Sequence, residues 1–276
     1  MMRELFIEGV GFWSDLAAGW PQVEAVLAGR RDVSDRAVTA RRRPEPTGLS
    51  AAERRRAPDS VCLAMSAAEQ ALEQSGQKGA DVACVFASAH GDLGLTDYLC
   101  ATVADDARQL SPTRFHNSVH NAPVGYWTMA VGCRRASTAV AAWQYSFGAG
   151  LLEALVQCVT NNEPVLFSAY DMAAPGLLAQ LNSSRHLLAL ALVLSTQRSA
   201  SSRWTLQWQA GPVVAANNEH VGPDADGSWS VLSPLTANAM ADCLPFCRAM
   251  AVDRPNPVII RAGEAISLQL NLRRIE

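Results

Sequence analysis

The stretch that decides the fold is STAVAAWQYSFGAGLLEAL, residues 137–155. It begins as a β-branched and apolar run, passes through a short turn, and continues as an amphipathic helix. A nucleophile often occupies a strand-to-helix turn of this kind. Here the turn contains Gln144, Tyr145 and Ser146 and no cysteine. The segment therefore has the outline of an active site without the residue that would carry out the chemistry.

On both sides of this segment, apolar strands alternate with helical patterns through the first 170 residues. The expected strands are LFIEGVGFW (5–13), ADVACVFASAHGD (80–92), 137–143 and EPVLFSAYD (163–171), and the expected helices cover 60–76, 93–106, 121–131 and 147–160. Such alternation predicts a layered α/β fold with a mostly parallel central sheet.

The remainder of the chain predicts shorter elements. Two apolar runs, 187–196 and 203–210, are expected to pair as strands. Residues 232–250 have a helical pattern interrupted by proline, and 257–263 with 265–272 should close the chain as a hairpin.

Composition excludes some classes of function. The 276 residues carry a net charge of −3, so there is no global attraction to nucleic acid or to an anionic membrane. The longest apolar run, Leu187–Ser195, is shorter than the ~18 residues that a membrane span needs. The arginine clusters Arg41–Arg43 and Arg54–Arg56 suit a solvated face, or alternatively a docking patch for an acidic partner.

The cysteines indicate a reducing compartment. Their number is odd, and no secretory leader precedes them, which predicts reduced thiols in the cytoplasm. Cys243 and Cys247 have a CxxxC spacing, but two further metal ligands are missing nearby, so buried structural thiols are the expected role. The seven cysteines are Cys62, Cys84, Cys100, Cys133, Cys158, Cys243 and Cys247.

Four segments, in order, resemble a known family. ELFIEGVGFWSDLAAGW (4–20) is similar to the first strand and turn of β-ketoacyl synthases, and GCRRASTAVAAWQYSFGAGLLEAL (132–155) to their active-site stretch. EPVLFSAYDMAAP (163–175) and LLALALVLS (187–195) resemble two later strands. The resemblance extends over roughly residues 3–200 and implies a thiolase-like fold.

An ungapped comparison of the active-site stretch assigns individual positions. Gly132 matches the family's first glycine, Ser137 its serine and Val140 its valine. The catalytic cysteine then falls on Gln144. A ketosynthase needs a thiolate at the N-terminus of a buried helix, and glutamine cannot be acylated in that way. The resemblance therefore implies a degenerate site.

The chain is also short for this family. Active ketosynthases have a second thiolase-like half with two histidines that promote decarboxylation of a malonyl unit. We therefore expect one ketosynthase-like domain over 1–276, in which 211–276 is a rudimentary C-terminal part. NEHVGPD, around His220, echoes a family histidine motif, but only 76 residues separate it from Gln144. That distance is too short for the missing strands and helices.

Glutamine in place of the cysteine is typical of one subset, the chain length factors of type II polyketide systems. These are non-catalytic proteins that form heterodimers with an active ketosynthase, which condenses units carried on acyl carrier protein. The small size and RFHNSVHNAPVGYW (114–127) resemble the short ketosynthase-like proteins of aryl polyene and xanthomonadin-type pigment clusters. No cofactor is implied.

Several bulky or polar side chains near the pseudo-site are candidates for a subunit interface or for the wall of an acyl tunnel. In the family, the strand before the nucleophile lies beside the dimer axis, although core packing is an equal alternative for the aromatic residues. His116 and His120 could bind a metal if they shared a helix face, but no third ligand is evident, so a role at the interface is expected. The candidates are Val140, Trp143, Gln144, Tyr145, Phe147, Tyr126, Trp127, His116 and His120.

Two other classes of function remain open. One is a stand-alone acyltransferase or malonyl decarboxylase that uses an unorthodox residue such as His220 or Cys133. Cys133 precedes the strand at 137–143, however, and should lie at its far end from Gln144. The other is a homodimeric scaffold that binds carrier protein.

Overall fold

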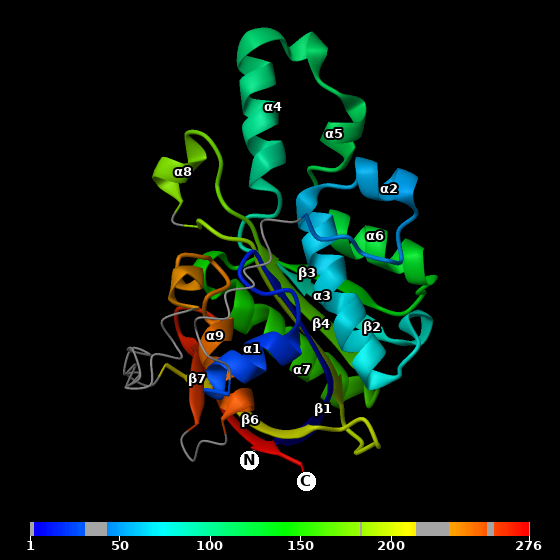
Figure 1. The fold of residues 1–276 in the computed structure, drawn as a ribbon, viewed down its shortest axis with the longest axis vertical. Helices are drawn as coiled ribbons and strands as arrows, with labels where there is room; N and C mark the ends of the chain where they lie inside the picture. The colour runs from blue at the N-terminus through cyan, green and yellow to red at the C-terminus, as the bar shows by residue number, and fades with distance from the viewer. Residues whose placement is uncertain (1–2, 31–42, 183, 214–231, 253–256, 276) are drawn as a thin grey trace.

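The computed structural model describes residues 3–30, 43–182, 184–213, 232–252 and 257–275. Its centre is an eight-stranded sheet in the order β3-β2-β4-β5-β1-β6-β8-β7 (Figure 1). The strands are β1 (Arg3–Ser14), β2 (Ala83–Ala87), β3 (Ser137–Val140), β4 (Val165–Asp171), β5 (Leu188–Ser195), β6 (Trp204–Pro212), β7 (Val258–Arg261) and β8 (Ile266–Arg274).

The prediction of a layered α/β fold is confirmed, but most of the sheet is not parallel. Only β3, β2 and β4 run parallel to one another. All other neighbouring strands are antiparallel. The link from β4 to β5 contains one four-residue helix, α8 (Leu178–Leu181), and reverses the chain instead of crossing the sheet. A parallel neighbour would need a longer crossover, usually with a full helix packed on the sheet.

One predicted strand pairing is wrong. The strands at 187–196 and 203–210 form β5 and β6, but β1 lies between them and is antiparallel to both. Periodicity identified each strand. The order of the strands in the sheet depends instead on long-range pairing, in which β1 forms hydrogen bonds with both of them. The expected C-terminal hairpin is confirmed as β7 and β8. These two strands extend the same sheet.

Helices cover both faces of the sheet (Figure 1). On one face α3 packs across β1, β5 and β4, with α6 beside it. On the other face α7 packs on β2 and β4, with α1 and α9 over the antiparallel part. The α-helices are α1 (Trp20–Leu27), α2 (Ala51–Arg56), α3 (Asp59–Ser75), α4 (Leu93–Asp106), α5 (Pro112–His116), α6 (Ala122–Val131), α7 (Ser146–Asn161), α8 and α9 (Cys243–Ala251), and the described 3-10 turns are η1 (Gly79–Asp81), η2 (Ala107–Gln109), η3 (Trp143–Tyr145) and η5 (Ser233–Thr236).

Alternate side chains of the buried strands supply the two cores. In β4, Phe167 points into the core under α7, whereas Leu166 and Tyr170 point into the core under α3. The contact between α3 and β1 is close because of Gly11, where an added Cβ would lie 1.9 Å from the carbonyl oxygen of Ala67. Any side chain at this glycine would push the helix off the sheet.

Three helices project beyond the layers. In Figure 1, α4 and α5 rise from the top of the sheet and α8 lies beside them. Leu93 is the only residue of α4 that is fully buried in this chain. An isolated helix of this length is marginal in water, because most helical stability in proteins comes from packing of an apolar face. None of the described helices is long and apolar enough to cross a membrane.

Candidate pseudo-active site and interface

The candidate site lies where β3 leads into α7. β3 ends at Val140, η3 follows, and α7 begins at Ser146. The Ser146 hydroxyl holds this turn: it accepts a hydrogen bond from the Ala142 N–H at 2.8 Å and donates one to the Trp143 carbonyl at 2.7 Å. The strand–turn–helix predicted from residues 137–155 is therefore present, and Gln144 occupies its turn.

The backbone at this turn is strained. Trp143, immediately before Gln144, has φ of +49°, a conformation that bulky L residues rarely adopt. Strain of this kind costs on the order of 1–3 kcal/mol and is concentrated at functional sites. Close packing fixes the start of α7, because an added Cβ on Gly148 would lie 2.1 Å from the carbonyl oxygen of Arg261. The strained residue thus lies directly before Gln144, in a turn whose following helix is fixed by close packing.

The Gln144 side chain is exposed. No hydrogen bond from the described residues reaches its amide, so local bonding within this chain does not explain the glutamine. Tyr145 is half-buried, and the guanidinium carbon of Arg261 lies 4.8 Å from its ring centroid. In this chain the amide therefore faces outward, available to another molecule.

The expected interface residues fall into two groups. Trp143 is 75% exposed, and Val140 is half-buried and packs against the core under α7. Phe147 and Trp127 are instead fully buried: Phe147 packs on Phe167 with centroids 5.7 Å apart, and Trp127 packs on Phe86 at 6.3 Å. For these two aromatics the structure supports the alternative of core packing.

The histidine pair does not form a helical metal site. α5 ends at His116, and His120 follows in the next turn, so the two histidines do not share a helix face. His116 is exposed, whereas the Nε2 of His120 lies 3.0 Å from the carbonyl oxygen of Ser88. Tyr126 donates a hydrogen bond to the Asn117 side-chain oxygen at 3.2 Å. No group of three potential metal ligands occurs among the described residues.

The β3 side of the sheet is open. β3 is the terminal strand, and in the described chain it pairs with β2 alone. Exposed apolar side chains occur on η3 and α6 and on or next to the projecting helices α4, α5 and α8. They are Val103, Phe115, Val119, Met129, Trp143, Leu177 and Leu181. An unpaired edge with exposed apolar residues is an aggregation hazard unless another chain covers it.

The alternative nucleophiles are poorly placed. The Cys133 thiol donates a hydrogen bond to the carbonyl oxygen of Val82 at 3.3 Å, just before β2 begins. Because β2 and β3 are parallel, this is the opposite end of both strands from Gln144. The four residues of β3 alone span about 13 Å. His220 lies outside the described residues.

The arginine clusters are partly used in structure. Arg43 pairs with Asp59 and donates to the carbonyl oxygen of Arg54, and Arg54 in turn donates to the carbonyl oxygens of Pro46 and Leu49. Arg55 and Arg56 are exposed, as a solvated face requires, while Arg41 and Arg42 lie outside the described residues.

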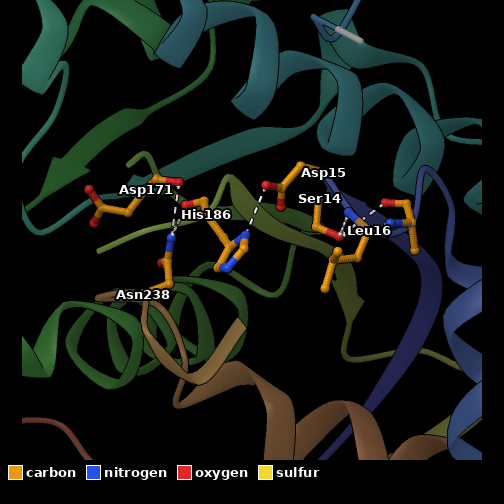
Figure 2. Close-up of polar contacts among 7 residues, drawn as sticks. Ser14, Asp15, Leu16, Asp171, His186 and Asn238 are labelled. Atoms are coloured by element: carbon orange, nitrogen blue, oxygen red, sulfur yellow. Dashed lines mark hydrogen bonds and ion pairs between the residues drawn. The ribbon is translucent and has the colours of Figure 1, made fainter. Parts of the chain in front are cut away.

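Two polar contacts between distant segments, one half-buried and one buried, were not anticipated. Figure 2 shows that Asp15, after β1, binds the His186 ring before β5, with Oδ2 and Nδ1 2.9 Å apart. The Asn238 amide donates to the carbonyl oxygens of His186 at 2.6 Å and Asp171 at 3.4 Å. Asp171 and His186 lie before and after α8 in the chain, so the Asn238 side chain connects the two ends of the segment that contains α8.

Asp171 is the most unusual of these groups. It ends β4 and is completely buried, and burial raises the pKa of its carboxyl group to about 7. Its Oδ2 accepts a hydrogen bond from the Ala89 N–H at 2.7 Å. An aspartate at the end of a mostly apolar, fully buried strand was the sequence signal that could have identified it.

The sheet with helices on both faces, and the strand–turn–helix at its parallel end, define a thiolase-like α/β protein. The β-ketoacyl synthase N-terminal domain family matches residues 30–246. The chain belongs to this family. A search of curated proteins gave no match.

Solved structures have the same fold. A ketosynthase in complex with its chain length factor from Xenorhabdus doucetiae superposes with a TM-score of 0.69 at 20% identity, over 97% of this chain and 98% of that one. A type II polyketide synthase acyl-carrier protein in complex with its ketosynthase bound to the hexaketide gives 0.69 at 14%, over 98% and 99%. The ishigamide ketosynthase/chain length factor gives 0.65 at 13%, over 99% and 100%.

Proposed function

We propose that the protein is a non-catalytic, chain-length-factor-like subunit that pairs with an active β-ketoacyl synthase. The observation that carries this proposal is Gln144: the resemblance of residues 132–155 to the family's active-site stretch aligns it with the nucleophile, and it lies in the turn between β3 and α7. The partner would condense malonyl units held on acyl carrier protein in a type II polyketide or aryl polyene system. This chain would complete the dimer and form part of the product tunnel.

The chemistry of the turn supports a non-catalytic role. A condensing enzyme passes through a thioester, which requires a thiolate that attacks and later leaves. A carboxamide is neither nucleophilic nor a leaving group under these conditions. We further propose that the chain is a single ketosynthase-like domain whose residues 211–276 are a reduced second half, without the two histidines that promote decarboxylation.

The unpaired edge of the sheet supports the proposal that a partner subunit binds there. The unpaired side of β3, the exposed Trp143 and the projecting α4–α5 pair would be satisfied by one apolar interface. The described residues also suit a reducing cytoplasm, since all seven cysteines are unpaired. Two of the similar solved structures contain a ketosynthase with a chain length factor, which is the arrangement proposed here.

The first test of this function is the activity of the isolated chain. The purified protein, free of any ketosynthase, is incubated with acyl- and malonyl-carrier protein, and products are followed by mass spectrometry. We expect no β-ketoacyl product and no malonyl decarboxylation above the rate without protein. Turnover by the chain alone would support the acyltransferase or decarboxylase alternative and would contradict the proposal.

A second prediction is that restoring the thiol does not restore condensation. In Gln144→Cys the new thiol would lie just before α7, where the helix N-terminus favours the thiolate. We expect one additional site to react with a thiol probe relative to wild type and to Gln144→Ser, which serves as the matched control. Condensation should stay at background, because the proposed reduced second half would not supply the decarboxylating histidines. Robust condensation by Gln144→Cys alone would show that the second half is functionally complete.

A further inference from the structure

Arg261, the last residue of β7, packs against the start of α7. An added Cβ on Gly148, in the first turn of this helix, would lie 2.1 Å from the Arg261 carbonyl oxygen. α7 follows directly after residues 141–145, which we call the Gln144 turn. A residue from a distant part of the chain is therefore held beside this turn.

The Arg261 side chain lies over Tyr145, the last residue of the Gln144 turn. The guanidinium carbon is 4.8 Å from the centre of the Tyr145 ring, which is within the range of a cation–π contact. Nη2 donates a hydrogen bond to the carbonyl oxygen of Glu264 at 2.8 Å and a longer one to that of Gly263 at 3.5 Å. Nε is buried and has no hydrogen-bond partner among the described residues.

An arginine at this place requires an explanation. Tyr145 is the N-cap residue of α7, and the N-terminus of a helix carries a partial positive charge that disfavours a nearby cation. A buried N–H without a partner adds a further cost. The compensating interaction is the negative face of the Tyr145 ring, so the arginine is stabilised only where the turn holds that ring beneath it.

The Gln144 turn depends on this contact in return. Trp143 has φ of +49°, and its side chain is 75% exposed, as that of Gln144 is also exposed. The Tyr145 N–H donates to the Ala142 carbonyl oxygen at 2.9 Å, but this hydrogen bond lies within the turn. Among the three side chains of η3, only that of Tyr145 is half-buried, so it is the one that attaches η3 to the rest of the chain.

We propose that Arg261 is a positioning residue for the Gln144 turn: by binding the face of Tyr145, it keeps η3 in the strained form that directs Trp143 and Gln144 outward. This contact acts within one chain, whether or not a ketosynthase binds. Its consequence for the partner rests on the proposed function. A turn that is already held in the binding form loses less conformational freedom when the ketosynthase docks on it.

The test uses the full chain alone, labelled with 5-fluorotryptophan, and Trp143→Phe assigns the fluorine resonance. In Arg261→Met we expect this resonance to sharpen and move toward that of a free indole, and the amides of residues 142–145 to exchange about fivefold faster, as the loss of one cation–π contact implies. Arg261→Lys, which retains the charge, should restore part of the protection. Arg274→Met is the matched control: it removes a guanidinium 5.8 Å from the Trp204 ring and should leave the Trp143 resonance unchanged.

Tyr145→Leu removes the same contact from the other side and replaces Arg261→Met if that variant does not fold. Each single variant should have the same effect, and the double variant should be no worse, because residues in contact are not additive. Unchanged Trp143 signals and exchange in either folded variant, or additive effects in the double variant, would overturn the proposal. A wild-type Trp143 resonance already identical to that of free 5-fluorotryptophan would also overturn it.

Binding to a ketosynthase distinguishes this proposal from the proposed function. If no ketosynthase binds the wild-type chain while Arg261→Met alters the Trp143 resonance, the positioning role of Arg261 stands and the proposed function fails. If the wild-type chain binds, Arg261→Met should have about fivefold lower affinity. Equal affinity of the two chains would overturn the consequence for the partner.

Discussion

Replacement of Trp143 by aspartate should dissociate the proposed complex with a ketosynthase while leaving this chain folded. Trp143 is 75% exposed and lies on the turn beyond the open edge strand. Interface tryptophans are often the residues that contribute most to binding, and a carboxylate in the same place would be desolvated without a partner. We expect a loss of about 3 kcal/mol or more, which is over a hundredfold in Kd.

Ile266→Asp is the matched control. Ile266 is an exposed apolar residue at the start of β8, toward the other end of the sheet, so its substitution should leave the complex intact. Circular dichroism checks that both variants are folded, and size-exclusion chromatography of the co-expressed pair reads out binding. A Trp143→Asp complex of unchanged mass and affinity would place the interface elsewhere.

Val140 is a less clean probe of the same surface. From the sequence, Val140→Asp is expected to split the complex by burying an unpaired charge, at a cost of about 3 kcal/mol. In the structure Val140 is half-buried and also packs against the core under α7. Its substitution would therefore destabilise the chain as well as the interface, whereas Trp143 makes no such contribution to the core.

The second large effect is a fall in stability as pH rises from about 4 to 7. Burial raises the pKa of Asp171 from 3.8 to about 7, so the folded chain binds a proton over this interval that the unfolded chain has released. The contribution is fully present below pH ~4, declines through the interval, and is lost above the folded pKa. A difference of about three between the two pKa values is worth up to about 4 kcal/mol.

Urea unfolding measured at intervals between pH 4.5 and 8 tests this effect. Asp171→Asn removes the titration, so its curve should be flatter than that of wild type and should cross it toward higher pH. Asp15→Asn serves as the control, because it changes a half-buried aspartate but leaves Asp171 in place. Equal slopes for wild type and Asp171→Asn would show that Asp171 does not titrate in this interval.

The sequence was informative where the structural cause is local. The strand–turn–helix at 137–155 follows from consecutive residues, and the fully buried β4 and β5 follow from predominantly apolar runs. The position of Gln144 in that turn could also be predicted, because it depends only on spacing along one segment.

The sequence was uninformative where contacts join distant segments. Asp15 and His186 are 171 positions apart and meet only because β1 and β5 are antiparallel neighbours. The direction of β5 depends on whether the link after β4 crosses the sheet, which periodicity cannot reveal. For the same reason, Phe147 and Trp127 could be assigned to the core only once their neighbours were known.

Co-purification of this chain with an active ketosynthase encoded beside it tests the central claim most directly. Both are co-expressed with the tag on the ketosynthase alone, and the eluted species is analysed by size-exclusion chromatography with light scattering. The proposal predicts a stable one-to-one heterodimer, and poor solubility of this chain when it is expressed alone, because an obligate interface of roughly 2,000 Å² or more would be left exposed. A well-behaved monomer or homodimer that ignores the ketosynthase would contradict it.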